Sequence, residues 1–183
     1  MKLTPTQSQS TFRAVLDAMS RPGTIRQLPE SECPAVLLPM LTLADLDTGI
    51  CVLDDDPTWE SFVQLATGAP IQTLDAARYV AVLRAVGTDE LALANRGTAM
   101  RPEFGALVCL SVPDVLGGEP VRITGPGIDG TAEVAPQGFD AWDGRGTWTG
   151  AGNSNDFPRG IDLLLVAPDG RVVGIPRTTR KVN

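Results

Sequence analysis

Arginines, hydroxyls and carboxylates are the groups of this chain that could do chemistry, because the other common catalytic groups are missing. The sequence contains no histidine, which excludes Ser-His-Asp and Cys-His nucleophile activation and histidine-based metal sites. Its lysines, Lys2 and Lys181, lie near the two ends of the chain, where side chains are usually mobile and solvated. A Schiff-base lysine needs a desolvated pocket, so we expect neither pyridoxal phosphate nor aldolase-type chemistry.

The stretch GIPRTTR at residues 174–180 gathers such groups most closely. An arginine and two hydroxyls offer the planar cation and the donors that recognise phosphate or carboxylate. The candidates for binding an anion or a protein partner are Arg177, Thr178, Thr179, Arg21 and Arg101. Each arginine can instead pair with one of the 22 acidic residues, since arginine is common at interfaces as well as at anion sites. The sequence leaves both interpretations open.

Asp162 lies inside the apolar stretch GIDLLLV, where an ionised carboxylate is costly unless it is hydrogen-bonded. The turn APDGR predicts a hairpin that pairs Ala167 with Arg171. Continued along both strands, this register makes Thr178 a same-face neighbour of Asp162 and turns Arg177 to the other face. We therefore predict that Asp162 is a structural acceptor for Thr178 or for backbone amides, in preference to a catalytic acid.

Two further patterns have simpler structural explanations than chemical ones. Asp45 and Asp47 could bind a divalent cation, but two carboxylates without more oxygen ligands are a weak signal, and capping of a turn explains them. The motif GPGIDG at residues 125–130 matches the GxGxxG dinucleotide fingerprint, yet the residues after it are typical of a strand. We predict structural roles for both aspartates and a turn between strands for the glycine motif.

The order of periodic segments predicts an α/β fold, with one domain over residues 1–183 and a mixed sheet flanked by helices. An amphipathic helix is expected directly after Ser10. The apolar run at residues 105–112 is typical of a strand covered on both faces, and residues 120–124 are expected as its antiparallel neighbour. We expect GIPRTTR to be chiefly a central strand whose end presents Arg177.

Residues 138–156 form the longest stretch without periodicity, and they are rich in glycine, asparagine and aspartate. Such a composition predicts a long surface loop that is either mobile or functional. Trp142 and Trp148 suit contact with another protein, where aromatic side chains act as anchors. Packing of the loop onto its own core is the competing interpretation.

Charge and hydropathy exclude several classes of partner. A formal charge of -7 without clustered lysine or arginine argues against nucleic acid. The most apolar window, residues 35–44, is broken by Pro39 and is shorter than the ~20 residues that a membrane span needs. The 3 cysteines are odd in number and too far apart for a CxxC pair, which is typical of reduced, buried thiols. We expect a soluble, cytoplasmic protein.

Six ordered stretches carry a resemblance to a known family. They are FRAVLDAMSRPGTI (12–25), LTLADLDT (41–48), GTAMRPEFGALVCL (97–110), ITGPGI (123–128), FPRGIDLLLV (157–166) and IPRTT (175–179). As an ordered set they resemble the PhnH family, the H subunits of the bacterial carbon–phosphorus lyase system. Each stretch alone is a weak signal, but the set is specific and runs along nearly the whole chain.

The resemblance implies a fold similar to pyridoxal-phosphate-dependent transferases but without the cofactor site, so no bound cofactor is expected. It also implies a subunit that forms homodimers and assembles with the G, I and J subunits. In that system the G, H, I and L subunits are linked to the step that displaces adenine from ATP with a phosphonate, giving a ribose 1-phosphonate 5-triphosphate. The resemblance assigns no catalytic residue to this chain.

We therefore expect a non-autonomous subunit that is needed for organophosphonate catabolism and has no catalytic activity alone. The alternative is a stand-alone phosphate- or phosphonate-binding protein or a carboxylate-based enzyme. In that alternative Arg177 and its neighbours hold the anion, while Asp162 or Glu103 moves protons.

Overall fold

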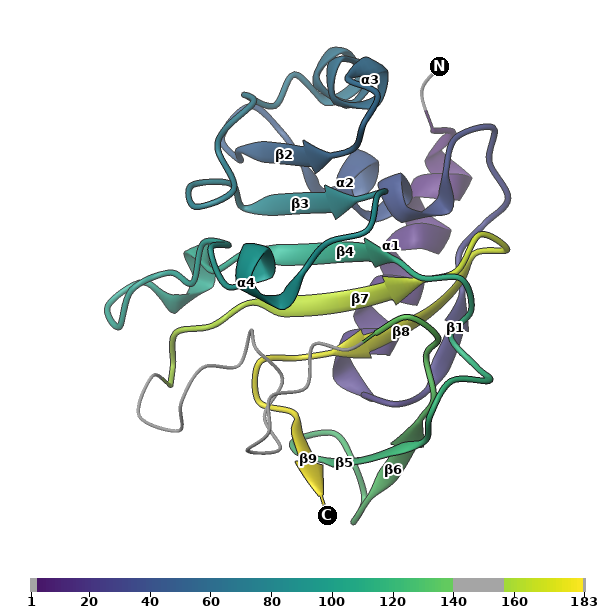
Figure 1. Cartoon of the computed structure of the whole chain (residues 1–183). Helices are drawn as coiled ribbons and strands as arrows, with labels where there is room; N and C mark the ends of the chain where they lie inside the picture. Colours follow the sequence, from purple (N-terminus) through teal and green to yellow (C-terminus); the bar gives the residue numbers. More distant parts are fainter. Residues whose placement is uncertain (1–2, 140–156, 183) are drawn as a thin grey trace.

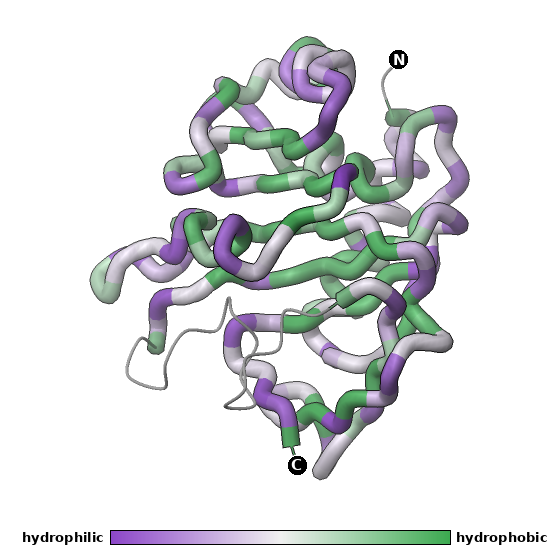
Figure 2. The backbone as a smooth tube through the Cα atoms, viewed as in Figure 1, coloured by the Kyte–Doolittle hydropathy of each residue, from purple (hydrophilic) through white to green (hydrophobic). Residues whose placement is uncertain are grey.

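Apolar strands buried on both faces form the centre of the protein. The computed structural model describes residues 3–139 and 157–182, so Trp142, Trp148 and most of the expected loop at 138–156 lie outside the described residues. In the central strand β4 (Leu107–Ser111), successive side chains enter two different buried clusters. Figure 2 shows hydrophobic residues concentrated along this strand and its neighbours. The predicted strand with both faces covered is confirmed.

The large sheet has the strand order β1-β8-β7-β4-β3-β2 (Figure 1). Its other strands are β1 (Ile25–Gln27), β2 (Ile50–Leu53), β3 (Tyr79–Val82), β7 (Asp162–Val166) and β8 (Arg171–Ile175). Strands β2, β3, β4 and β7 are parallel, whereas β8 is antiparallel to both β7 and β1. The sheet is therefore mixed, and the predicted α/β class is confirmed.

Helices lie on both faces of this sheet (Figure 1). They are α1 (Pro5–Ser20), the 3-10 helix η1 (Ala35–Leu37), α2 (Leu38–Leu43), α3 (Thr58–Thr67) and α4 (Thr88–Leu91). Residues of α1, α2 and α3 share one buried cluster, while Leu91 of α4 belongs to the cluster on the opposite face. Within the described residues, no helix is long and apolar enough to span a membrane.

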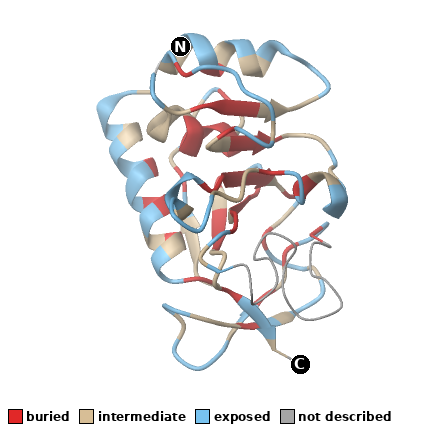
Figure 3. Ribbon diagram, turned by 90° about the vertical axis from the view of Figure 1, so that its left-hand side faces the viewer, coloured by how far each residue is buried: buried red, intermediate tan, exposed pale blue. Residues whose placement is uncertain are grey.

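Helix α1 begins at Pro5, well before the predicted start after Ser10. Thr4 accepts a hydrogen bond from the Gln7 amide and the Gln7 side chain bonds back to Thr4, which is a complete capping box with proline in the first turn. The apolar periodicity that guided the prediction starts only later in the helix. As Figure 3 shows, one side of α1 is buried and the other exposed. Phe12 is 48% exposed, so it lies outside the core face.

A second, three-stranded sheet has the order β6-β5-β9. Its strands are β5 (Val121–Thr124), β6 (Ala132–Val134) and β9 (Arg180–Val182). The predicted pairing of residues 120–124 with β4 is wrong, because β3 and β7 already occupy both edges of β4. The segment 125–130 does connect two antiparallel strands, β5 and β6, which confirms the turn predicted for GPGIDG.

The hairpin of β7 and β8 has the predicted register. The Ala167 amide donates to the Arg171 carbonyl, and Leu163 lies opposite Ile175. Strand β8 ends at Ile175, however, and the Thr179 amide closes a turn onto the Pro176 carbonyl. The prediction that GIPRTTR is chiefly a central strand is therefore wrong beyond Ile175, because proline has no amide to continue the ladder.

The three cysteines are free and buried, as predicted. Burial raises the pKa of Cys51 to about 11 and that of Cys109 to about 12. Both thiols are therefore protonated at neutral pH and unsuited to nucleophilic chemistry.

Gly174 of β8 lies directly against the backbone of α1. A Cβ atom there would lie 2.4 Å from the Ala18 carbonyl oxygen of α1. We predict that Gly174→Ala lowers the free energy of unfolding by about 1 to 3 kcal/mol, because helix and strand must separate. Chemical denaturation measures this loss. Gly87→Ala is the control, since a Cβ there meets nothing within 4 Å and should cost less than about 1 kcal/mol. Equal losses for the two variants would contradict the packing argument.

Candidate functional site

Polar side chains gather at the edge of the large sheet where the parallel strands begin. Asp162 is the first residue of β7, Arg78 directly precedes β3 and Gly49 directly precedes β2. The 3-10 helix η2 (Pro102–Phe104) lies just before β4. Parallel strands begin at a common edge, so these segments converge. Open α/β sheets usually bind ligands at the opposite, carboxyl edge.

Arg177 and Asp162 form a bidentate ion pair at this edge. The Arg177 Nη2 and Nε atoms donate to Asp162 Oδ2 at 2.7 and 3.2 Å, and the Arg177 backbone amide donates to Oδ1 at 2.9 Å. The two side chains are only 13% and 21% exposed. The pair compensates a carboxylate at the start of a buried strand, so the predicted structural role of Asp162 has a direct explanation.

Thr178 is not the partner that the extended register predicted for Asp162. The ladder ends at Ile175, and Arg177 lies in the following turn, from which both its amide and its guanidinium reach Asp162. The prediction that Arg177 points to the other face is wrong for the same reason. Asp162 accepts from a backbone amide, as the prediction allowed, but its side-chain donor is an arginine.

Arg177 and Arg78 hold the same turn from two sides. Arg177 Nη1 donates to the Pro102 carbonyl at 2.8 Å and to the Pro158 carbonyl at 3.3 Å. Arg78 Nη1 donates to the carbonyl of Gly105, the residue after η2. Each nitrogen of the Arg177 guanidinium thus has an internal acceptor. The arrangement fixes η2 against the starts of β3 and β7 and leaves Arg177 poorly placed to bind an external anion.

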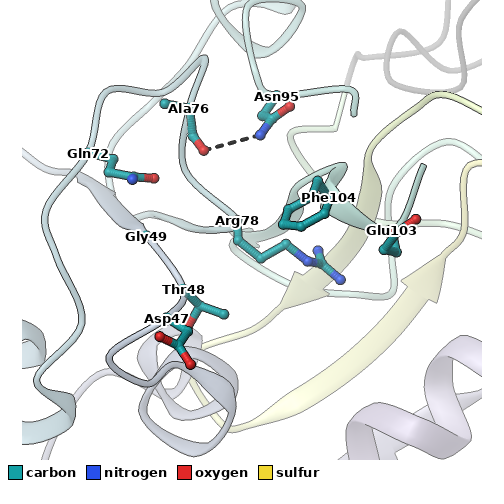
Figure 4. A pocket seen from close by; sticks show the side chains of 9 residues that line it. All are labelled: Asp47, Thr48, Gly49, Gln72, Ala76, Arg78, Asn95, Glu103 and Phe104. Carbon is teal, nitrogen blue, oxygen red and sulfur yellow. Dashed lines mark hydrogen bonds between the residues drawn. The ribbon is translucent and has the colours of Figure 1, made fainter. Parts of the chain in front are cut away.

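A pocket of about 350 Å³ opens beside η2 (Figure 4). It is lined by Asp47, Thr48, Gly49, Gln72, Ala76, Arg78, Asn95, Glu103 and Phe104. The lining comes from the turn before β2, the segment before β3 and the segment before β4. Arg78 extends across the pocket toward the side that carries Glu103 (Figure 4). The volume suits a small molecule rather than a peptide.

Some groups of this pocket already have partners. The Asn95 amide donates to the Ala76 carbonyl and accepts from the Gly97 amide. The Thr48 hydroxyl bonds with Asp45. Burial raises the pKa of Tyr79, whose ring lies 5.2 Å from the guanidinium carbon of Arg78, and that cation partly offsets the rise. The pocket therefore combines a rigid, hydrogen-bonded wall with exposed polar side chains.

The remaining candidates differ in exposure. Thr179 is 1% exposed, whereas Arg21 is an exposed residue at the end of α1. Arg101 is exposed and stacks 5.0 Å above the Phe104 ring. Within the described residues, Arg21 and Arg101 share no hydrogen-bond acceptor with Arg177.

The two aspartates before β2 differ in role. Asp45 accepts from the Asp47 amide and the Thr48 hydroxyl, which confirms its predicted turn-capping role. Asp47 instead lines the pocket. Among residues 3–139 and 157–182, no group of three or more His, Cys, Asp or Glu side chains is placed to hold a metal ion.

Sequence reasoning missed Arg78 and Gln72. Arg78 directly precedes the apolar strand in AARYVAVL, and Asp162 is the first residue of the strand in GIDLLLV. A comparison of the polar residues at the start of each parallel strand would have placed Arg78 and Asp162 at the same edge of the sheet. Gln72 carries no comparable signal, because its position depends on the path of the loop between α3 and β3.

The chain resembles known proteins of one kind. A family model described as "Bacterial phosphonate metabolism protein (PhnH)" matches residues 2–182. The subunit PhnH of alpha-D-ribose 1-methylphosphonate 5-triphosphate synthase from Rhizobium meliloti (strain 1021) is 32% identical over 194 residues, covering 95% of this chain and 90% of the relative. The putative C-P lyase subunit protein HtxG of Stutzerimonas stutzeri is 33% identical over 177 residues, covering 94% of this chain and 85% of that relative.

Gly105 contacts both arginines, because its carbonyl accepts from Arg78 and its Cα faces the guanidinium of Arg177. We predict that it tolerates no side chain. A Cβ there would lie 2.2 Å from the Gly160 carbonyl oxygen and 2.9 Å from Nη1 and Nη2 of Arg177. Its φ of -58° suits alanine, so the cost of Gly105→Ala is purely steric. Thermal and chemical denaturation should show a loss of about 2 kcal/mol or more. A loss no larger than that of Gly87→Ala would show that η2 is not held tightly.

Proposed function

We propose that this chain, which belongs to the family of bacterial phosphonate metabolism proteins (PhnH), is a non-autonomous subunit of a carbon–phosphorus lyase complex. The carrying observation is the match of the family model to residues 2–182. The names of both relatives support it, since each is described as a subunit rather than as a complete enzyme. The protein then contributes to organophosphonate catabolism.

The step we assign to the complex is formation of a ribose 1-phosphonate 5-triphosphate from ATP and a phosphonate. This proposal follows the name of the Rhizobium relative, a subunit of alpha-D-ribose 1-methylphosphonate 5-triphosphate synthase. The partners we propose are the G, I and J subunits. We further propose that the isolated chain forms a cytoplasmic homodimer, because closed twofold dimers are the commonest oligomers.

A supporting role in the complex agrees with the chemistry of the described residues. Arg177, the main candidate for an anion site, makes hydrogen bonds to Asp162, Pro102 and Pro158. The thiols of Cys51 and Cys109 are protonated, and the sequence has no histidine. These features favour a subunit over the stand-alone phosphonate-binding protein or enzyme, for which Arg177 would have to leave its internal partners.

We also propose that the fold is related to pyridoxal-phosphate-dependent transferases and that the chain binds no such cofactor. Lys181, the lysine among the described residues, is exposed in β9. A Schiff-base lysine functions in a desolvated pocket, so this position supports the proposal.

Co-expression with the G, I and J subunits of the same organism tests the subunit role. We predict that the affinity-tagged chain co-purifies all three, and that native mass spectrometry of the product shows one defined multi-subunit complex. Recovery of the chain alone, with the other three subunits soluble in the same lysate, would contradict the proposal.

The isolated chain tests whether the protein has catalytic activity without the other subunits. Incubated with ATP and methylphosphonate, it should release no adenine above the level of a buffer blank, whereas the full set of subunits should. Adenine release by the isolated chain would favour the stand-alone enzyme.

A further inference from the structure

We propose that the pocket beside η2 binds a neutral nucleobase or nucleoside. The inference rests on the pocket itself and not on the subunit role. Its volume of about 350 Å³ lies at the small end of the range of ligand sites, which suits a base or a nucleoside. The class of ligand follows from three further features: the free hydrogen-bonding groups, the charge of the lining and the aromatic side chain at the rim.

Four lining side chains have hydrogen-bonding capacity to offer a ligand. Gln72, Asp47 and Glu103 are exposed, and their side-chain polar atoms make no hydrogen bond with other described residues. Arg78 uses Nη1 for the Gly105 carbonyl, which anchors the guanidinium while its other nitrogens remain available. Glutamine, acidic side chains and arginine are the groups that read the edges of bases, because they match adjacent amino, ring-nitrogen and carbonyl positions.

The charge of the lining favours a neutral ligand. Arg78 lines the pocket together with two carboxylates, Asp47 and Glu103, and Arg101 adds a second cation where it stacks on Phe104. The pocket and its rim thus carry no excess of positive charge, in a chain whose formal charge is -7. A phosphate or triphosphate would find no net positive charge to neutralise it, whereas an exocyclic amino group can donate to a carboxylate and a ring nitrogen can accept from Arg78.

Phe104 supplies the surface on which a base can stack. It lines the pocket and is 47% exposed, and the guanidinium carbon of Arg101 lies 5.0 Å from its ring centroid. Its place in η2 is fixed because Arg177 and Arg78 hold the carbonyls of Pro102 and Gly105. Such a rigid aromatic platform next to base-reading side chains is the usual arrangement for an unpaired base.

Amide chemical shifts of the purified, isotope-labelled chain test the inference. Adenosine, adenine and cytidine are titrated separately, with ATP and ribose as comparison ligands. We predict that at least one base-containing neutral ligand saturates shifts at Gly49, Asn95 and Gly105 with a Kd below about 1 mM. ATP should bind at least about tenfold more weakly than adenosine because of its charge, and ribose should not saturate.

Variants locate the site. Glu103→Gln and Phe104→Leu should each weaken base binding about tenfold, since they remove a charged acceptor and a stacking surface. Glu133→Gln is the matched control, because it removes the same charge from an exposed side chain of β6, outside the pocket. If none of the three neutral ligands saturated the shifts at 10 mM, about tenfold above the expected Kd, the proposal would be overturned. Tighter binding of ATP than of adenosine, or equal effects of Glu103→Gln and Glu133→Gln, would also overturn it.

Discussion

The structure at this edge of the sheet depends on two arginines, Arg177 and Arg78, that each hold the η2 segment in place. Arg177 joins the start of β7, through Asp162, to the Pro102 carbonyl, and Arg78 joins the start of β3 to the Gly105 carbonyl. Both guanidinium groups therefore act on one short turn before β4. The Arg177–Asp162 charges are partly buried, so their contribution depends on the complete hydrogen bonding of Arg177 as well as on Coulomb attraction. Gly105 allows this approach because it has no side chain.

The same constraint separates two kinds of arginine at this edge. All guanidinium nitrogens of Arg177 donate to acceptors within the protein, so Arg177 has a structural role, although its sequence context suits anion recognition. Arg78 is anchored by one nitrogen and keeps the rest for the pocket. This division lets one edge of the sheet hold both a tightly bonded clamp and a pocket with free hydrogen-bonding groups. Family membership supports a subunit role in phosphonate metabolism.

The sequence predicted the strands and the hairpin register better than it predicted side-chain partners and strand pairing. Apolar periodicity and the APDGR turn located the central strands and the register of the last hairpin, because these depend on local pattern. The partner of Asp162 was missed because a single proline ends the ladder and redirects Arg177. The pairing of β5 was missed because it depends on which edges of β4 are already occupied. The pocket needed three loops to be placed together, which no single segment reveals.

A double-mutant cycle on Asp162 and Arg177 tests most directly the claim that this pair is an internal clamp. Asp162→Ala, Arg177→Met and the double variant are compared with the parent protein by chemical denaturation. The account predicts that each single change costs about 2 to 3 kcal/mol, less than in a fully buried pair, and that most of the second loss is absent from the double variant. Additive losses would contradict it, since they would show that the two side chains act independently.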